Sequence, residues 1–184
     1  TEVCSSYQEG IAEYIQRTLS NERYRIYIND DVAGCELGGV LKNPIALGCG
    51  IARGMKLGDN TVAALMTRGL EEIKRLGVSI GADAETFLGL SGMGDLIVTC
   101  TSMHSRNRRC GIMIGEGMSP AEATEKVGMV VEGMFTTEAA YELAKREGVE
   151  MPITEAIYKT VQGEITAAEA VEILMGRERK HEQA

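Results

Sequence analysis

The alternation of apolar and polar residues is mostly helical in period, and its most unusual stretch covers residues 36–48. This stretch, ELGGVLKNPIALG, is apolar on nearly every side but carries Lys42 in its middle. In a helix the Lys42 side chain leans over Gly39 and Gly38, which have no side chain to cover it. The ammonium therefore either meets a partner there or extends along the helix to reach water. Pro44 cannot donate an N–H to the preceding turn, so we expect a kink just after Lys42.

Further helices are predicted from apolar spacing and from capping residues. In residues 62–76 the apolar positions form one face, Glu71 and Arg75 are expected to pair on the other, and Gly77 is expected to end the helix. Residues 89–101 are glycine-rich and then apolar, which predicts a loop that leads into a buried segment. The charged tail from Arg177 is expected to fray. The remaining predicted helices are 7–19, a central helix capped by Asn29 or Asp30, 83–87 capped by Asp83, one starting at Ser105, 136–146, 153–161, and two with capping boxes at Ser119 and Thr166.

Residues 24–28, YRIYI, are the only convincing strand signal. One short strand cannot make a sheet, so we expect its partners in a domain that precedes this sequence. The prediction is therefore an all-α fold with one short N-terminal strand. Residues 1–28 would be the last helix and strand of a nucleotide-binding domain, and residues 29–184 a helical substrate-binding and catalytic domain. The unpaired strand is expected either to pair with its copy, giving a homodimer, or to be disordered.

Composition narrows the function. The 184 residues hold 27 acidic and 19 basic side chains, a net charge of −8, which disfavours nucleic acid and requires any anion site to be a local basic cluster. Five cysteines without metal-like spacing, and only two histidines, predict reduced thiols and no metal site. The longest apolar run, residues 32–52, is broken by Glu36 and Lys42, and the sequence opens without a signal peptide. We therefore expect a cytoplasmic protein with no membrane span.

Three polar clusters interrupt the helical pattern: Lys42-Asn43, the segment 92–95 followed by Thr99, and residues 105–109. A lysine and a carboxylate (Asp95) among glycine and apolar residues suit acid–base work on an alcohol or carbonyl. A serine followed by Arg-Asn at a helix start suits a phosphate. The alternatives are that Asp95 is only a cap or turn residue, and that the arginines form a solvated face.

Taken in order, the clusters resemble a known family. ELGGVLKN (36–43), GDNTVAALMTRGLEEIKRLG (58–77), LSGMGDLIVTCTS (90–102), SRNRR (105–109) and VVEG (130–133) resemble the C-terminal domain of bacterial NAD(P)-dependent glycerol-3-phosphate dehydrogenase. The resemblance runs from about residue 25 to 182 and implies the 6-phosphogluconate dehydrogenase C-terminal-like fold. Pro44 departs from the aliphatic residue usual in the family. Related hydroxy-acid dehydrogenases place an asparagine where this chain has Ala46, which disfavours them.

The resemblance implies a role for each matching residue. Catalysis would be carried by Lys42, the general acid/base, and Asp95. The substrate would be contacted by Lys42, Asn43, Asp95, Thr99, Ser105, Arg106 and Asn107. The cofactor, NAD or NADP, would be bound mainly by a preceding domain and touched here by Arg106, Val130 and Glu132.

The resemblance implies an oxidoreductase that interconverts sn-glycerol 3-phosphate and dihydroxyacetone phosphate and supplies glycerol phosphate for phospholipid synthesis. Its partner would be a small-molecule phosphate ester. We expect this chain to be inactive alone, because it would hold only half of a hydride-transfer site. The alternatives are a non-catalytic α-helical dimerisation module, in which Lys42, Asp95 and Arg106 would point in different directions, and a related 2-hydroxy-acid dehydrogenase domain.

Overall fold

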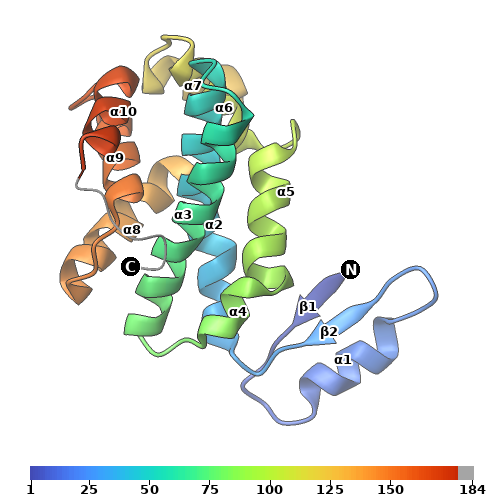
Figure 1. Cartoon of the computed structure of the whole chain (residues 1–184). Coiled ribbons are helices and arrows are strands. Elements are labelled where there is room, and N and C mark those ends of the chain that lie inside the picture. The colour runs from blue at the N-terminus through green and yellow to red at the C-terminus, as the bar shows by residue number, and fades with distance from the viewer. Residues whose placement is uncertain (178–184) are drawn as a thin grey trace.

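The computed structural model describes residues 1–177, in which a bundle of helices surrounds α2 and a small two-stranded unit projects at one end (Figure 1). The mainly α-helical class is confirmed. Most of the tail that was expected to fray, residues 178–184, lies outside the described residues. The elements are β1 (Glu2–Cys4), α1 (Ile11–Leu19), β2 (Ile26–Ile28), α2 (Val32–Gly54), α3 (Asp59–Ser79), α4 (Ala84–Leu88), the π-helix η1 (Leu90–Gly94), α5 (Asp95–Thr101), α6 (Arg106–Gly115), α7 (Pro120–Val127), α8 (Glu132–Glu147), α9 (Pro152–Val161) and α10 (Ala167–Met175).

The N-terminal segment is a β–α–β unit rather than a lone strand. β2 confirms a strand within residues 24–28, but β1 pairs with it in parallel, with Val3 opposite Tyr27. The expectation of a single strand without a partner in the chain is therefore wrong. β1 has only three residues, too few to show the alternation of apolar and polar side chains by which a strand is recognised in a sequence. Gln16 ties α1 to β2 by donating to the Ile26 carbonyl oxygen at 2.8 Å.

Asp31 caps α2, in place of Asn29 or Asp30. Its Oδ1 accepts from the Gly34 N–H at 2.8 Å, and its Oδ2 accepts from the Asp83 N–H at 2.8 Å. One carboxylate thus serves the start of α2 and the residue before α4. Burial raises the pKa of Asp31, but these hydrogen bonds outweigh it, so the pKa lies below its ordinary value.

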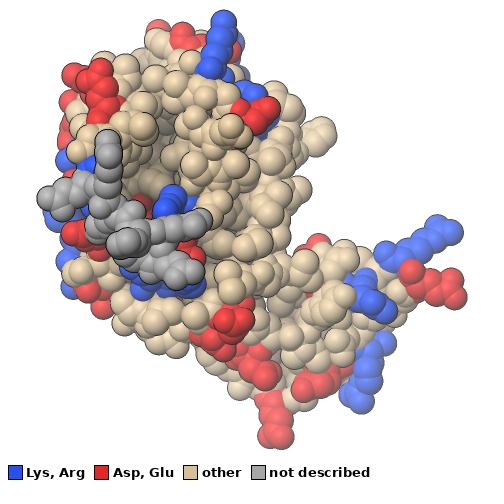
Figure 2. Space-filling model, in the orientation of Figure 1, with Lys and Arg blue, Asp and Glu red and all other residues tan. Residues whose placement is uncertain are grey.

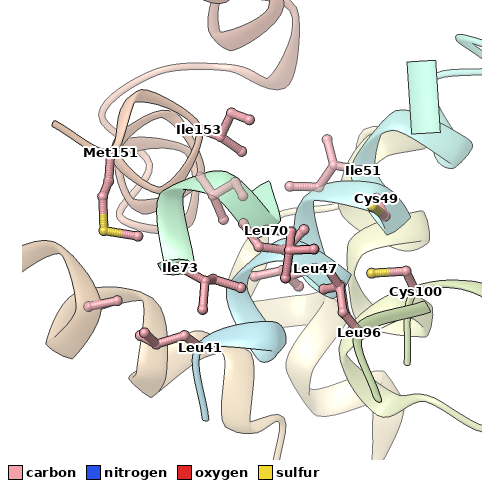
Figure 3. Close-up of a cluster of buried hydrophobic side chains, with 14 of the residues drawn as sticks. Leu41, Leu47, Cys49, Ile51, Leu70, Ile73, Leu96, Cys100, Met151 and Ile153 are labelled. Carbon is pink, nitrogen blue, oxygen red and sulfur yellow. The ribbon is translucent and has the colours of Figure 1, made fainter. Parts of the chain in front are cut away.

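α2 continues through Pro44 as one helix of 23 residues, and most of its C-terminal half is buried. It forms the axis of the core: Leu47 is completely buried among side chains from α3, α5 and α9 (Figure 3). α6 lies directly against it, because a Cβ on Gly111 would stand 2.1 Å from the Leu47 carbonyl oxygen and 2.9 Å from Gly50 Cα. These glycines let the two backbones touch and so fix α6 relative to α2.

α3 differs from the prediction at its end and on its outer face. Gly77 does not end the helix but makes room for the Phe87 ring, whose nearest atom would lie 2.2 Å from a Cβ there. Glu71 pairs with Lys74 at 2.7 Å, not with Arg75. Arg75 instead donates to the Glu150 carbonyl oxygen at 2.9 Å. Lys74 and Arg75, three and four residues after Glu71, are both within reach of its carboxylate, so the sequence pattern could not tell which of the two would pair with it.

Residues 90–101 are helical, so the loop expected over residues 89–101 is wrong. The π-helix η1 runs directly into α5, and it packs closely on two elements. A Cβ on Gly38 of α2 would stand 2.5 Å from the Ser91 carbonyl oxygen, and one on Gly92 would stand 2.2 Å from the Phe87 carbonyl oxygen. Glycines that suggested a loop are thus contact points for a widened helical turn, which places Asp95 at the start of α5.

The remaining helix starts were predicted from local chemistry, and most are confirmed. Asp83 caps α4 and Ser105 caps α6, while the Ser119 and Thr166 capping boxes open α7 and α10. α1 and α8 are the exceptions, since α1 begins at Ile11 and not at the expected residue 7, and α8 begins at Glu132 and not at the expected residue 136. No side-chain hydrogen bond caps α1 or α8, so their starts lack the local signal that marks α4, α6, α7 and α10.

All five cysteines are free, as predicted, and Cys49, Cys100 and Cys110 are buried. A hydrogen bond with Cys49, together with burial, raises the pKa of the Cys100 thiol well above its ordinary value. The three buried cysteines therefore act as small apolar groups within the core, whereas Cys4 and Cys35 are half-buried.

Glu72 is a buried acid in the middle of α3, with only 2% of its surface exposed. Its carboxylate accepts from the backbone N–H groups of Ile153 and Thr154 at 2.7 and 3.0 Å, and from the Thr154 hydroxyl at 2.9 Å. A side chain of α3 thereby satisfies the free N–H groups at the start of α9. Burial raises the pKa of Glu72, and the three hydrogen bonds oppose the rise.

Within residues 1–177, no helix combines the length and the apolar character that crossing a lipid bilayer requires.

Candidate active site

Lys42 and Asp95 form an ion pair between the middle of α2 and the first residue of α5. The Lys42 side chain is 19% exposed and that of Asp95 35%, so the pair lies at the edge of the protein rather than in bulk water. The two glycines beneath the lysine differ in their surroundings. The Ser91 backbone fills the space over Gly38, whereas nothing lies within 4 Å of a Cβ built on Gly39. Lys42 is thus held by a partner and open on one side.

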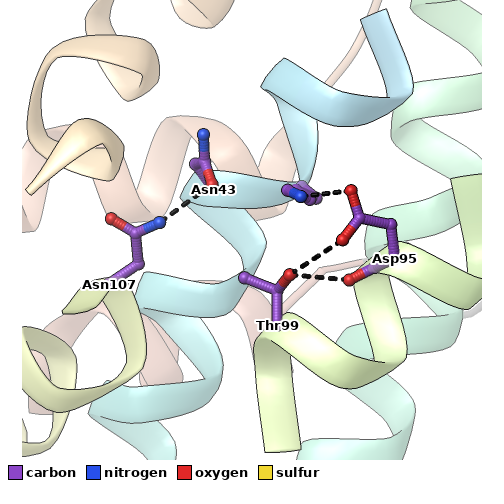
Figure 4. A network of polar contacts seen from close by, with 5 residues as sticks. Asn43, Asp95, Thr99 and Asn107 are labelled. Carbon is purple, nitrogen blue, oxygen red and sulfur yellow. Dashed lines mark hydrogen bonds and ion pairs between the residues drawn. The ribbon is translucent and has the colours of Figure 1, made fainter. Parts of the chain in front are cut away.

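Thr99 supports the carboxylate of Asp95 from one helical turn further along α5 (Figure 4). Its hydroxyl donates to the Asp95 carbonyl oxygen at 2.7 Å, and its Oγ1 lies 3.4 Å from Asp95 Oδ1. One carboxylate oxygen therefore faces Lys42 and the other faces Thr99. This divides the two acceptor groups of Asp95 between a cation and a hydroxyl.

A second group of polar contacts links α2, α6 and α8, and Figure 4 shows the contact between α2 and α6. Asn107, which is 4% exposed, donates from Nδ2 to Asn43 Oδ1 at 2.8 Å. Its Oδ1 accepts from the Gly133 N–H at 2.8 Å. Asn107 was expected to contact the substrate, but in this structure both ends of its amide contact the protein.

Arg106 forms an ion pair with Glu132 at the start of α8, with side chains 37% and 42% exposed. Ser105 Oγ accepts from the Arg108 N–H at 3.2 Å and caps α6, so its hydroxyl oxygen is partly engaged. Val130 is 62% exposed and stands two residues before Glu132. The first turns of α6 and α8 therefore place a guanidinium, free helix N–H groups and an exposed apolar side chain together.

The predicted residues thus form two groups joined by the adjacent Lys42 and Asn43. The first group is Lys42, Asp95 and Thr99, and the second is Asn43, Asn107, Arg106 and Glu132. Sequence reasoning missed the Gly133 N–H, because it placed the start of α8 four residues too late. The VVEG motif was the available signal, since its glycine follows the acidic residue that begins the helix.

The surface of α5 next to Asp95 is apolar. Leu90 and Met93 of η1 and Ile97 and Val98 of α5 are between 38% and 55% exposed. Few charges appear over this side of the helical bundle in the space-filling view (Figure 2). A ligand at Lys42 would therefore be bordered by apolar side chains, which strengthens electrostatic contacts by limiting water.

The arrangement combines a lysine whose ammonium can give a proton and whose neutral amine can take one, a carboxylate that orients it, and an Arg at a helix N-terminus that favours anions. These features together define a helical domain with a lysine–carboxylate pair and a separate basic helix N-terminus. Comparison with known proteins identifies the family to which this domain belongs. Residues 31–172 match the family described as "NAD-dependent glycerol-3-phosphate dehydrogenase C-terminus". The chain belongs to this family.

Named relatives and solved structures agree with the family match. The chain is 54% identical over 182 residues to a glycerol-3-phosphate dehydrogenase [NAD(P)+] of Shouchella clausii, covering 99% of this chain and 54% of that protein. It is 57% identical over 180 residues to one of Thermoanaerobacter sp., covering 98% and 54%. A crystal structure of glycerol-3-phosphate dehydrogenase from Coxiella burnetii superposes with a TM-score of 0.91 at 39% identity, covering 96% of this chain and 55% of that one. The chain therefore spans about half the length of the relatives that it matches.

Proposed function

We propose that this chain is the substrate-binding part of an enzyme that interconverts sn-glycerol 3-phosphate and dihydroxyacetone phosphate with NAD or NADP. The observation that carries the proposal is the Lys42–Asp95 ion pair, which is connected to the start of α6 by the hydrogen bond between Asn43, next to Lys42, and Asn107, next to Arg106. The rival, a non-catalytic dimerisation module, gives no reason for Lys42 and Asp95 to converge. Such an enzyme would supply glycerol phosphate for phospholipid synthesis.

Lys42 is the group proposed to move the substrate proton. In reduction it would give a proton from Nζ to the oxygen of the substrate carbonyl, and in oxidation it would take the proton of the resulting hydroxyl. Asp95 holds the ammonium from one side, and Thr99 holds Asp95 in turn. The open space over Gly39 is where the reacting carbon and its oxygen would approach.

The phosphate of the substrate is proposed to bind at the first turn of α6. Free backbone N–H groups at a helix start attract anions, and a guanidinium can bind two phosphate oxygens at once. Arg106 is paired with Glu132 in this structure and is 37% exposed, so it is accessible to such a ligand. This local positive site is compatible with the net charge of −8 of the whole chain.

The residues present fit only the edge of a nicotinamide cofactor. Val130 offers an exposed apolar side chain, and the half-exposed Arg106–Glu132 pair offers polar contacts, but these form a rim and not an enclosing site. When bound, the nicotinamide would supply or accept the hydride. The cofactor would be held mainly by other parts of the protein, so we expect the 184-residue chain alone to bind the phosphate ester without turnover.

We also propose that the protein does not bind nucleic acid, because its excess of acidic residues would repel the phosphate backbone. A cytoplasmic location is proposed as well.

Calorimetric titration of sn-glycerol 3-phosphate into the chain tests the proposal. Arg106→Ala should weaken binding about ten- to a hundredfold, the usual loss of one charge-assisted contact. Arg106→Lys should recover little, because an ammonium lacks the planar fork. Arg108→Ala is the matched control and should change affinity less than about threefold, because residues two apart in a helix point to opposite faces, whereas Arg109, three residues along, shares the face of Arg106. Equal losses for Arg106→Ala and Arg108→Ala would indicate a diffuse basic patch and contradict the proposed site.

A further inference from the structure

A cavity of about 240 Å³ lies between the C-terminal end of α8 and the N-terminal end of α9, away from the candidate active site. α8 has 16 residues, so roughly 24 Å of helix separate this end from Glu132, which begins the helix at the candidate active site. None of the residues expected to bind substrate or cofactor lines the cavity. We call it the α8–α9 cavity, and its apolar lining residues are Ala144, Val149, Met151 and Pro152.

Charged side chains also line the α8–α9 cavity, and one of them, Lys145, lacks a counter-ion. Glu150 pairs with Arg177 at 3.2 Å, and Glu155 pairs with Lys159 at 2.7 Å, so both carboxylates of the lining are matched by a cation. In the part of the chain that the structure describes, no carboxylate forms an ion pair with Lys145. The cavity therefore carries an excess of positive charge, in a chain whose net charge is −8.

Lys145 contacts an aromatic ring in place of a carboxylate. Its Nζ lies 4.9 Å from the centroid of the Tyr141 ring, and that ring is stacked on Tyr158 with the two centroids 4.3 Å apart. The stacking holds Tyr141 in place as one wall of the cavity. A cation–π contact uses none of the N–H donors of an ammonium, and no hydrogen bond joins Lys145 Nζ to an acceptor within residues 1–177. These donors are therefore available to a ligand.

We propose that the α8–α9 cavity binds a small organic anion, that is, a carboxylate or phosphate joined to an apolar or aromatic body. The anionic group would accept hydrogen bonds from Lys145, and the body would lie against Met151, Val149 and the Tyr141 ring. An inorganic anion would leave the apolar wall in water, and a cation would be repelled by Lys145. The volume is below the roughly 300–1,000 Å³ of sites for drug-sized ligands, so the ligand is small. This site does not depend on the function proposed for Lys42 and Asp95.

NMR titration of the isotope-labelled full chain with phenyl phosphate tests the proposal, because this probe joins a phosphate to an aromatic ring. Backbone amide signals of residues 149–151 and 153–155 should shift and saturate, with a Kd of about 1 mM or lower. Inorganic phosphate and phenol each carry one half of the probe, and each should bind at these residues at least about tenfold more weakly. The absence of a saturable shift at these residues, or equal binding of either half, would overturn the proposal.

Competition with sn-glycerol 3-phosphate separates this site from the candidate active site. This molecule has a phosphate but no apolar body, so an excess of it should not displace phenyl phosphate from residues 149–155. Phenyl phosphate shifts confined to the first turns of α6 and α8 would place the probe at the candidate active site and contradict the α8–α9 site. Failure of the chain to bind sn-glycerol 3-phosphate is a different result, which refutes only the proposed function.

Substitution of Lys145 tests the anion contact. Lys145→Met removes the charge and keeps a side chain of similar length, and it should weaken phenyl phosphate binding about tenfold. Lys145→Arg should stay within about threefold of the unsubstituted chain, because a guanidinium also binds phosphate. Lys145 is exposed at the end of α8, so both variants should fold. Equal losses for Lys145→Met and Lys145→Arg would contradict a charge contact and overturn the proposal.

Arg146→Met is the matched control for the loss of one positive charge. Arg146 is the next residue of α8, its side chain is 73% exposed and pairs with Glu147, and it does not line the cavity. Arg146→Met should change the affinity for phenyl phosphate less than about twofold. A loss as large as that of Lys145→Met would mean that the probe responds to overall charge, and the α8–α9 site would have to be abandoned.

Discussion

Gly38 of α2 lies against the backbone of Ser91 in η1, so closely that a Cβ on Gly38 would stand 2.5 Å from the Ser91 carbonyl oxygen. Four residues later on the same helix, Lys42 pairs with Asp95, which begins the helix after η1. The close backbone contact and the ion pair therefore join the same two segments. The adjacent Gly39 has nothing within 4 Å of the corresponding position, which makes the two glycines a matched pair.

We expect Gly38→Ala to lower the free energy of unfolding by about 1–3 kcal/mol, because the added methyl group pushes η1 away from α2. Gly39→Ala should raise it by about 0.5–1 kcal/mol, because alanine is the better helix former and meets no neighbour. Urea unfolding of both variants measures the difference. Equal effects of the two substitutions would contradict the close contact at Gly38.

Glu72 is expected to be the more important of two adjacent acids on α3. Glu72→Gln places an amide N–H against the N–H groups of Ile153 and Thr154, and we expect a loss of about 1–3 kcal/mol in the free energy of unfolding. Glu71→Gln, the control, removes a partly exposed pair with Lys74 and should cost at most about 0.5 kcal/mol. Chemical denaturation of the two variants at one pH gives the comparison.

The pKa of Glu72 also predicts a pH dependence. Because burial raises this pKa in the folded protein, the stability contributed by Glu72 is fully present below its ordinary pKa of 4.5 and is lost as pH rises through the folded value. The stability difference between the unsubstituted chain and Glu72→Gln should therefore be larger near pH 4 than near pH 8. A difference that grows with pH would show that the hydrogen bonds outweigh burial.

Asp31 should show the opposite pH dependence, because its pKa is lowered. Its contribution to stability is present above its ordinary pKa of 3.8 and is lost as pH falls through the folded value. Unfolding midpoints of the unsubstituted chain should therefore drop between about pH 5 and pH 2 more than those of Asp31→Asn. Asp30→Asn, one residue earlier and exposed, is the control and should keep the steeper drop.

Features that depend on a few neighbouring residues could be predicted from the sequence. Ser105, Ser119 and Thr166 begin helices as expected, because a cap and its N–H partner lie within three residues of each other. Lys42 was singled out because its helical neighbours are glycines, and its ion pair with Asp95 agrees with that reasoning. Local chemistry was enough in each of these places.

Features that depend on distant segments could not be predicted. The Glu72 contact with Ile153 joins residues 81 positions apart, and nothing in the α3 pattern distinguishes Glu72 from an exposed acid. Asn107 could be recognised as polar at a helix start, but its tie to Gly133 depends on where α8 begins. The glycine-rich sequence of η1 predicted a loop. Its glycines instead allow close contacts with α2 and Phe87, and these tertiary contacts leave no signal in the local sequence.

The β1–α1–β2 unit leads to a prediction about self-association. In the described residues its parallel sheet has two strands, so each strand has one edge without a neighbour. Tyr27 in β2 is 45% exposed, and Tyr7 and Tyr14 of the same unit are 81% and 60% exposed. An open edge with exposed aromatic side chains readily pairs with a second chain. We therefore expect this unit to mediate association of two copies, which is the homodimer that the sequence suggested.

Light scattering with size-exclusion chromatography tests the association. Removal of residues 1–28 should shift the chain toward monomer, and Tyr27→Lys should do so without deleting the strand, because a charge on an open edge disfavours pairing. Tyr24→Lys is the control, since Tyr24 precedes β2 and is not part of the ladder. The folded helical domain should survive all three changes, because its core is formed by α2 and the helices that follow it. A dimer that persists without residues 1–28 would place the interface on the helical domain and contradict pairing through the sheet.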